Sequence, residues 1–187
     1  MDKTHVIVHE QLTESIRPSE DSTTRNVNWL CCFNQGTCTL SVAMDKNVYF
    51  PGETAQISCQ IADNSEVEVS AMRCHLYQDI TLRLKHCRQT FEHKIAEATF
   101  PGVPAKTTVN QPLPLLLAPT VESSVMSPST SGEIIQCAYR IEIECDIPWC
   151  PDVQLHLPVT IIAPVFPLPF SEVPLTAGYI PPVVSSI

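Results

Sequence analysis

Glycine is scarce in this chain: only 5 of its 187 residues are glycine, against 17 prolines. A phosphate-cradling loop needs several glycines close together, and the sequence contains no such loop. The Gly-x-Ser-x-Gly elbow of serine hydrolases and the His-Glu-x-x-His pair of zinc proteases are absent as well. These absences argue against the common nucleotide-binding and hydrolytic enzymes, so we predict a protein that is not an enzyme and binds no cofactor.

Long apolar runs are also lacking. No window of 18 uninterrupted apolar residues exists, and the richest segment, residues 112–121, is broken by Pro112, Pro114 and Pro119. The apolar run Val6 to Val8 is far too short for the core of a signal peptide. We therefore expect a cytosolic protein.

Basic residues are few. The chain has 11 Lys and Arg against 20 Asp and Glu, and its net charge is −9. The average field of such a protein repels the phosphates of nucleic acids. We predict no nucleic-acid partner.

Alternating apolar residues are abundant. Between residues 135 and 161 the odd positions are apolar or aromatic while most even positions are polar, a period of two that fits a strand with one buried face. The break at residues 148–152 divides the pattern into two strands. The inward positions are Ile135, Cys137, Tyr139, Ile141, Ile143, Cys145, Ile147, Val153, Leu155, Leu157, Val159 and Ile161. A hairpin with one such face needs a second sheet to cover it.

Similar alternation recurs along residues 39–110, and helical periodicity is nowhere convincing. Some eight strands joined by turns predict an all-β fold, an antiparallel immunoglobulin-like β-sandwich. The longest strand begins near Val67, and its change of parity predicts a β-bulge near Ala71-Met72. Residues 88–100 and 106–110 are expected at sheet edges. Residues 13–36 are polar and read as an irregular linker, while prolines rule out regular structure from Pro164 onward.

The nine cysteines are an odd number, so they cannot all pair internally. Five of them lie on or beside apolar strand faces, which favours buried free thiols in a reducing compartment. The alternative is a secreted, disulfide-bonded β-sandwich that acts as a binding domain. The sets considered as zinc ligands do not follow the usual pairing of two cysteines two to four residues apart, so we predict no metal. Those sets are Cys31 and Cys32 with Cys38, and Cys145 with Cys150.

Two clusters of polar residues are candidates for a functional site. His156 with Glu142 or Glu144 could form a catalytic pair, but all three occupy outward positions, where solvated polar residues are common.

A cluster of basic residues lies where the longest strand reaches its turn: Arg83, Lys85 and Arg88, with His86. An acidic lipid or phosphorylated tail could dock there. A solvated hairpin tip is the simpler interpretation of this basic cluster.

Three blocks of this sequence resemble the C-terminal domain of arrestins, especially the α-arrestin or arrestin-domain-containing branch. The run from Thr39 to Ile61, with Pro51-Gly52-Glu53 in its turn, is similar to the opening of that domain. Residues 135–148 and 155–162 are similar to its closing hairpin. Pro167-Leu-Pro-Phe170 is similar to the Pro-Leu-x-Pro-Phe segment with which the chain leaves that domain. The resemblance implies three parts: a remnant strand and interdomain connector (1–36), an arrestin C-terminal-like β-sandwich (37–166) and a proline-rich tail (167–187). By this resemblance the N-terminal arrestin domain would be missing, and the protein would associate at most peripherally with endosomes or the plasma membrane.

By this resemblance the chain would be a non-enzymatic adaptor or scaffold in membrane-protein trafficking, covering endocytosis and endosomal sorting. Its partners would be membrane-cargo tails and trafficking proteins, and a retromer-type arrestin-like subunit is the alternative. α-Arrestins recruit ubiquitin ligases through Pro-Pro-x-Tyr motifs. The nearest segment here starts at Pro181 and Pro182, but Val184 stands in place of the tyrosine that a WW domain requires.

Overall fold

Every regular element in the part of the chain that the computed structural model describes, residues 15–29, 33–120 and 126–163, is a β-strand. This confirms the all-β prediction. The strands are β1 (Ser19–Trp29), β2 (Phe33–Met44), β3 (Val48–Tyr49), β4 (Thr54–Ala55), β5 (Ile57–Asp63), β6 (Val69–Leu84), β7 (Cys87–Val103), β8 (Thr108–Pro112), β9 (Leu115–Leu116), β10 (Thr130–Ser131), β11 (Ile135–Asp146) and β12 (Val153–Ile161).

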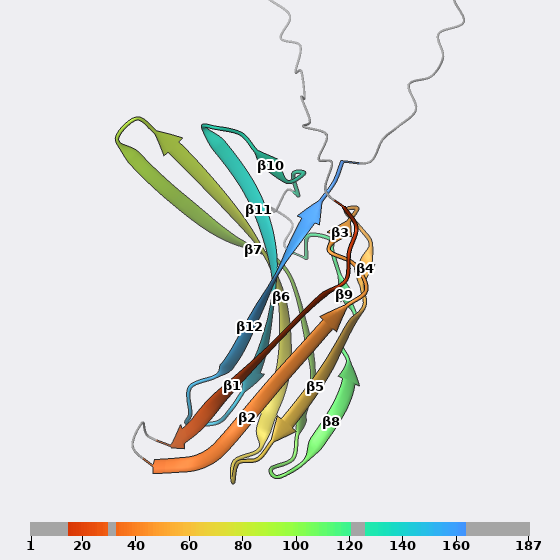
Figure 1. Ribbon diagram of the computed structural model, residues 1–187, viewed down its shortest axis with the longest axis vertical. Coiled ribbons are helices and arrows are strands. Elements are labelled where there is room, and N and C mark those ends of the chain that lie inside the picture. Colours follow the sequence, from red (N-terminus) through yellow and green to blue (C-terminus); the bar gives the residue numbers. More distant parts are fainter. Residues whose placement is uncertain (1–14, 30–32, 121–125, 164–187) are drawn as a thin grey trace, which may run out of the picture.

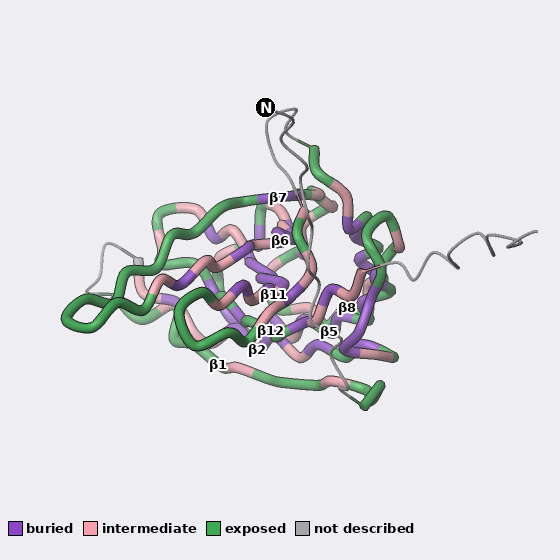
Figure 2. The backbone as a smooth tube through the Cα atoms, turned by 90° about the horizontal axis from the view of Figure 1, so that it is seen from above, coloured by how far each residue is buried: buried purple, intermediate pink, exposed green. Residues whose placement is uncertain are grey.

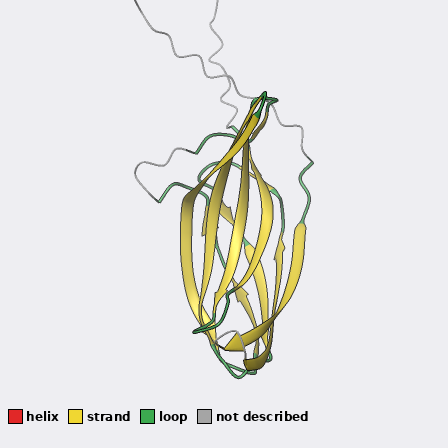
Figure 3. Ribbon diagram, turned by 90° about the vertical axis from the view of Figure 1, so that its left-hand side faces the viewer, coloured by secondary structure: helices red, strands yellow, loops and turns green. Residues whose placement is uncertain are grey.

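The strands form two larger sheets that pack face to face (Figure 1 and Figure 3). One is four-stranded, in the order β1-β2-β5-β8. The other is six-stranded, in the order β3-β12-β11-β6-β7, with β10 pairing with β11. Pairing is antiparallel throughout these sheets except between β12 and β3, and a small separate sheet joins β4 to β9. The predicted edge strands are confirmed, because β7 and β8 each end a sheet.

The core lies between the sheets and is built from alternate residues of both. Of the twelve inward positions predicted for the hairpin of β11 and β12, all are buried except Ile135. Leu40 and Ile61, both fully buried, come from the opposite sheet. The chain turns between β11 and β12 where the Ile147 N–H donates to Asp152 Oδ1 at 3.2 Å and Trp149 takes a φ of +63°. The period of two therefore correctly identified which side of each strand faces inward.

The prediction of an irregular linker over residues 13–36 is wrong for Ser19–Trp29, which forms β1. This strand pairs with β2 along its length, and among residues 19–28, whose side chains are described, only Val27 is buried. Figure 2 shows β1 along the outside of the molecule, mostly exposed. Backbone hydrogen bonds and hydroxyl pairs hold it, such as Thr24 Oγ1 to Thr39 Oγ1 at 2.9 Å. An edge strand of this kind has no apolar alternation for sequence analysis to detect.

The predicted bulge near Ala71-Met72 is also wrong. The pairing of β6 with β11 runs from Ala71 to Leu82 without a shift. The shift lies in the pairing with β7, between Leu76 and Tyr77, and the additional residue there is Ile95. Ile95 and its neighbour Ala96 are both buried, as the doubled position of a bulge permits.

The change of parity near Ala71 coincides instead with a close approach of two backbones. Gly102 lies so near to β6 that a Cβ atom at this position would be 1.9 Å from the carbonyl oxygen of Val69. Only glycine fits there. No residue is added to either strand at this point, because the pairing of Val69 with Val103 and of Ala71 with Pro101 keeps one register.

Beyond the bulge, β6 and β7 continue as a hairpin that extends away from the four-stranded sheet (upper left in Figure 1). We call this part, residues 77–94, the arm. Residues 83–94 are all exposed, although β6 and β7 stay paired up to Leu84 and Cys87. The remnant strand expected within residues 1–12 and the proline-rich tail lie outside the described residues, and the domain boundaries remain predictions.

Candidate functional site

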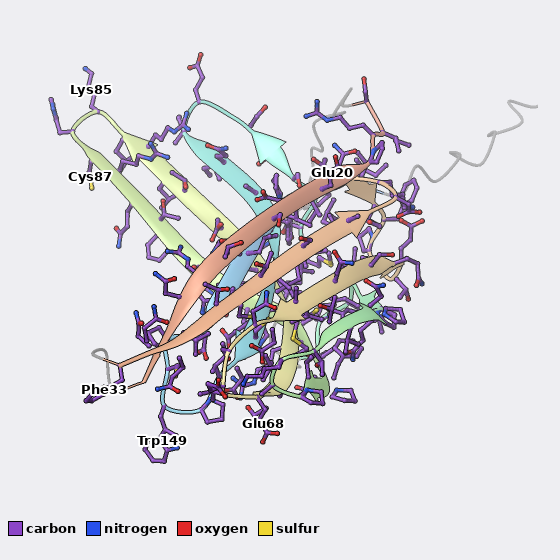
Figure 4. The ribbon with its side chains drawn as sticks, turned by 60° about the horizontal axis from the view of Figure 1, so that its bottom comes forward. Glu20, Phe33, Glu68, Lys85, Cys87 and Trp149 are labelled. Atoms are coloured by element: carbon purple, nitrogen blue, oxygen red, sulfur yellow. The ribbon has the colours of Figure 1, made fainter. Side chains whose placement is uncertain are left out.

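The arm brings the predicted basic residues together. It ends in a turn at Lys85-His86, and Arg83 on β6 lies directly opposite Arg88 on β7. Figure 4 shows Lys85 and Cys87 at the tip, well away from the body of the sandwich. The four basic side chains Arg83, Lys85, His86 and Arg88 therefore share one small, exposed end of the molecule.

The cations at this tip have no acidic partner within the described chain. Arg83 donates a hydrogen bond to Gln136 Oε1 at 2.6 Å, and no ion pair joins Arg83, Lys85 or Arg88 to a described residue. At the base of the arm the situation differs, because Arg140 bridges both Asp79 and Glu92. The charge at the tip is thus available to an external acidic group.

One face of the arm is apolar. The inward parity of the six-stranded sheet continues into the arm, where the four-stranded sheet no longer covers it. Leu84 is 65% exposed, Phe91 39% and Ile135 53%. Ile80 pairs with Phe91 across the hairpin and is half-buried. The arm therefore offers an apolar strip that ends at the turn Lys85-His86, and the pair Arg83 and Arg88 lies on the opposite face of the hairpin.

A second surface lies on the outer face of the four-stranded sheet. A shallow hollow of about 740 Å³ crosses its strands, and one row of it consists of the directly paired Ser22, Ser41, Gln60 and Asn110. Sequence analysis did not single out these residues, although their small polar side chains alternate with core positions. The hollow offers hydroxyls and amides, and the buried ionisable group among its lining residues is the thiol of Cys59, whose pKa burial raises to about 12, so the hollow suits binding better than catalysis.

A third feature is a row of histidines and carboxylates on the outer face of the six-stranded sheet. His75 on β6 lies opposite Glu142 on β11, and Glu142 lies opposite His156 on β12. His75 Nδ1 is 3.5 Å from Glu142 Oε1, and His156 Nδ1 is 3.2 Å from Glu142 Oε2. Glu97 on β7 continues the row beyond His75.

Glu144 lies beside this row on the same face of β11. Its Oε1 accepts from Arg73 at 3.0 Å and its Oε2 from Gln154 at 2.9 Å. Ligand atoms of His75, Glu142 and Glu144 all fall within 4.8 Å of one another, and this is the one such group with metal-ligand chemistry among the residues described.

The structure corrects the expectation that these outward positions are solvated. Glu142 and Glu144 are each only 8% exposed, as is His75, because long side chains on neighbouring strands cover them. His156, with about half of its side chain exposed, does meet Glu142. An imidazole paired with a carboxylate lacks a nucleophile and an oxyanion site in this arrangement, which makes it a poor hydrolase centre.

The thiols named as possible zinc ligands are placed differently. Cys145 is fully buried in the core and Cys150 is half-buried in the turn after β11. Hydrogen bonding to Cys38 and burial raise the pKa of Cys145, and burial raises the pKa of Cys59 and of Cys74 to about 12. Such thiols are protonated at neutral pH and pack as small apolar groups. Cys31 and Cys32 lie outside the described residues.

Residues 34–166 match the family described as Arrestin (or S-antigen), C-terminal domain. This match spans well over half of the chain and nearly all of the described sandwich. The chain belongs to the arrestin C-terminal domain family. The resemblance noted from the sequence is thereby confirmed, and the all-β sandwich is the fold that this family implies.

Two curated relatives of this arrestin-family chain come from Dictyostelium discoideum. The chain is 26% identical over 166 residues to "Arrestin domain-containing protein A", covering 87% of this chain and 27% of that protein. It is 25% identical over 150 residues to "Arrestin domain-containing protein B", covering 78% of this chain and 24% of that protein. The chain thus spans about a quarter of the length of these relatives.

Within the described residues, no helix has the length and apolar character needed to cross a bilayer. Of the predicted partner-binding residues, the structure places Arg83, Lys85 and Arg88 together at the arm tip. Pro181 and Pro182 lie outside the described residues, so their role stays a prediction.

Proposed function

We propose that this arrestin-family chain is a non-enzymatic adaptor module in membrane-protein trafficking, acting in endocytosis or endosomal sorting. The observation that carries the proposal is the family match over residues 34–166. Adaptors of this family work by binding other proteins, and the described surface offers binding features rather than a catalytic site. The partners would be cytosolic tails of membrane cargo and proteins of the sorting machinery.

The arm is the surface that we assign to partner binding. Its tip carries cations that no described acidic group neutralises, and its apolar strip includes Leu84 and Phe91. A peptide that has apolar residues next to acidic or phosphorylated ones would match both features. Because the whole chain carries a net charge of −9, the attraction would be local and would weaken as salt concentration rises.

The edge strand β7 supports the same assignment. It ends the six-stranded sheet, and residues 87–94 of this strand are exposed. An extended peptide can add to such an edge through backbone hydrogen bonds while its side chains reach the arm's apolar strip. Recruitment of a ubiquitin ligase through Pro181 and Pro182 is not part of this proposal, since the tyrosine of the motif is replaced by Val184.

Proximity labelling in cells tests the proposal. The chain fused to a labelling enzyme should enrich transporters and endosomal coat proteins relative to the enzyme alone. The double variant Lys85→Glu/Arg88→Glu should lose most of this enrichment. The matched control is Arg17→Glu/Arg25→Glu, which changes the net charge equally at two exposed positions away from the arm.

Two results would count against the proposal. If the unmodified chain enriches no membrane-trafficking proteins, the adaptor role fails. If both double variants lose the same partners to the same extent, the effect is one of overall charge and the arm is not the binding surface.

A further inference from the structure

We propose that His75, Glu142 and Glu144, with His156 beside Glu142, form a binding site for a divalent ion of the zinc class on the outer face of the six-stranded sheet. The site goes beyond the adaptor function and does not depend on it. Its ligands come from the adjacent strands β6 and β11, and His156 lies opposite Glu142 on the next strand, β12.

The spacing of the ligand atoms fits a tetrahedral ion. Nitrogen and oxygen ligands lie about 2.0–2.2 Å from zinc, so two ligands of one tetrahedral ion are roughly 3.3–3.6 Å apart. His75 Nδ1 is 3.5 Å from Glu142 Oε1, and ligand atoms of His75, Glu142 and Glu144 all fall within 4.8 Å of one another. Small side-chain rotations would bring these atoms to the spacing that the ion requires. His156 Nδ1 is 3.2 Å from the other carboxylate oxygen, Glu142 Oε2, so His156 orients this ligand from the neighbouring strand.

A buried nitrogen without a partner points into the site. His75 is 8% exposed, and its Nδ1 makes no hydrogen bond despite its position near Glu142. Leaving such an atom unsatisfied is costly, and metal coordination would satisfy it. The other ring nitrogen, Nε2, lies 3.9 Å from Glu97 Oε2, on the side where a carboxylate commonly orients a metal-bound imidazole.

The charges around Glu142 favour a cation. Glu142 and Glu144 are neighbours on one face of β11, and each is only 8% exposed. Arg73 pairs with Glu144, but no Lys or Arg within the described part of the chain pairs with Glu142. A buried carboxylate without a cation is unfavourable. A divalent ion held by His75, Glu142 and Glu144 would compensate it.

The ligand types select the class of ion. Imidazole nitrogen together with carboxylate oxygen is typical of zinc sites, whereas calcium and magnesium take oxygen ligands. Arg73 and Gln154 already hold the carboxylate of Glu144 in place, as surrounding groups commonly do for a metal ligand, and water would complete the coordination.

A titration of zinc chloride into the full 187-residue chain tests the proposal. Accessible thiols are first blocked with N-ethylmaleimide, so that cysteines do not compete, and bound zinc is followed by competition with a chromophoric chelator. We expect one ion per chain and a rise in the thermal unfolding temperature. Glu142→Gln and His156→Ala should each weaken binding by at least about tenfold.

The controls separate this site from others. His156 is about half exposed, so His156→Ala should fold normally; His93→Ala, at an exposed histidine on the arm, should bind zinc like the unmodified chain. Cobalt in place of zinc should show visible bands without sulfur-to-metal charge transfer. The proposal is overturned if zinc does not bind, if Glu142→Gln and His156→Ala bind as tightly as the unmodified chain, or if cobalt reports thiolate ligands.

Discussion

The two ends of β11 have the same sequence pattern and different surroundings. Ile143 and Ile135 share one parity and one face of the strand, yet Ile143 is fully buried while Ile135 is 53% exposed. The four-stranded sheet covers the first and stops before the second. A period of two thus identifies the face of a strand that is suited to burial, and the length of the opposing sheet decides whether that face is buried.

On the outer face of the same sheet the departure from the pattern is the opposite one, because some polar residues there are buried. Polar residues in its middle, such as Glu142 and His75, are buried, while the polar residues in the outer part of the arm, residues 83–94, are exposed. The arm is thus the region where both faces meet solvent. We assign binding to it for this reason, and the following predictions compare it with the sandwich.

Removal of a core side chain should have the largest effect. Ile143→Ala should lower the free energy of unfolding by about 2–5 kcal/mol, because it leaves a cavity between the sheets. Ile135→Ala, at the arm end of the same strand, should change it by no more than about 0.5 kcal/mol. Urea unfolding measures both. Equal losses would show that the arm face is covered as fully as the core.

Alkaline pH should destabilise the sandwich through its thiols. Burial raises the pKa of Cys59 and of Cys74 from about 9 to about 12, so the folded state holds these protons more tightly than the unfolded chain. The resulting stability is complete below pH 9 and is lost as pH rises toward 12, by up to about 1.4 kcal/mol per pH unit for each thiol.

Urea unfolding under reducing conditions at several pH values checks this dependence. Cys59→Ala should make the loss with pH less steep, whatever its effect at neutral pH. Cys87→Ala, on the arm, should leave the slope as it is in the unmodified chain. Burial raises the pKa of Tyr49 to about 12 as well, so part of the slope should persist in both variants. Identical slopes in all three proteins would refute the assignment to Cys59.

Removal of a hydrogen-bonding hydroxyl at the boundary between sandwich and arm should have an intermediate effect on stability. The Tyr139 hydroxyl accepts a hydrogen bond from Gln78 Nε2 at 2.6 Å and donates one to the Ser127 carbonyl at 2.5 Å. Tyr139→Phe would leave the buried Gln78 amide poorly satisfied and should cost about 1–3 kcal/mol. Tyr77→Phe is the control, expected within about 0.5 kcal/mol, because the Tyr77 hydroxyl bonds to no described residue. Thermal or urea unfolding of the two variants would decide.

The smallest effect on stability should come from modifying the arm thiol. Cys87 is exposed, whereas Cys38, Cys59, Cys74 and Cys145 are buried. Brief treatment with iodoacetamide should label Cys87 while these four stay unmodified, as mass spectrometry of peptides would show. The labelled protein should unfold at the same urea concentration as before. Labelling of the buried thiols at the same rate would mean that the sandwich opens readily.

Some features were readable from local sequence alone. The hairpin of β11 and β12, its turn and its inward residues follow from alternation, because each strand must bury one face. The edge positions of β7 and β8 were likewise predicted from irregular patterns and prolines. The basic residues of the arm tip are close in sequence, so their meeting at a hairpin turn needed no long-range information.

Other features needed the whole fold. β1 is held by pairing with β2, and Val27 is the one buried side chain described within residues 19–28, so no apolar alternation distinguishes this segment from a linker. The bulge at Ile95 arises from the pairing of two strands, and the spacing of apolar residues in β6 suggested a different place. His75, Glu142 and His156 are far apart in sequence and meet only because β6, β11 and β12 are adjacent.

The sequence by itself determined the fold class and which face of each main strand turns inward, because alternation of apolar and polar residues is a property of single strands. Tertiary structure decided the order of the strands, where the opposing sheet ends, and so which apolar residues stay exposed on the arm. It also decided which polar groups meet across strands. These outcomes depend on contacts between residues distant in the chain, and no local pattern specifies them.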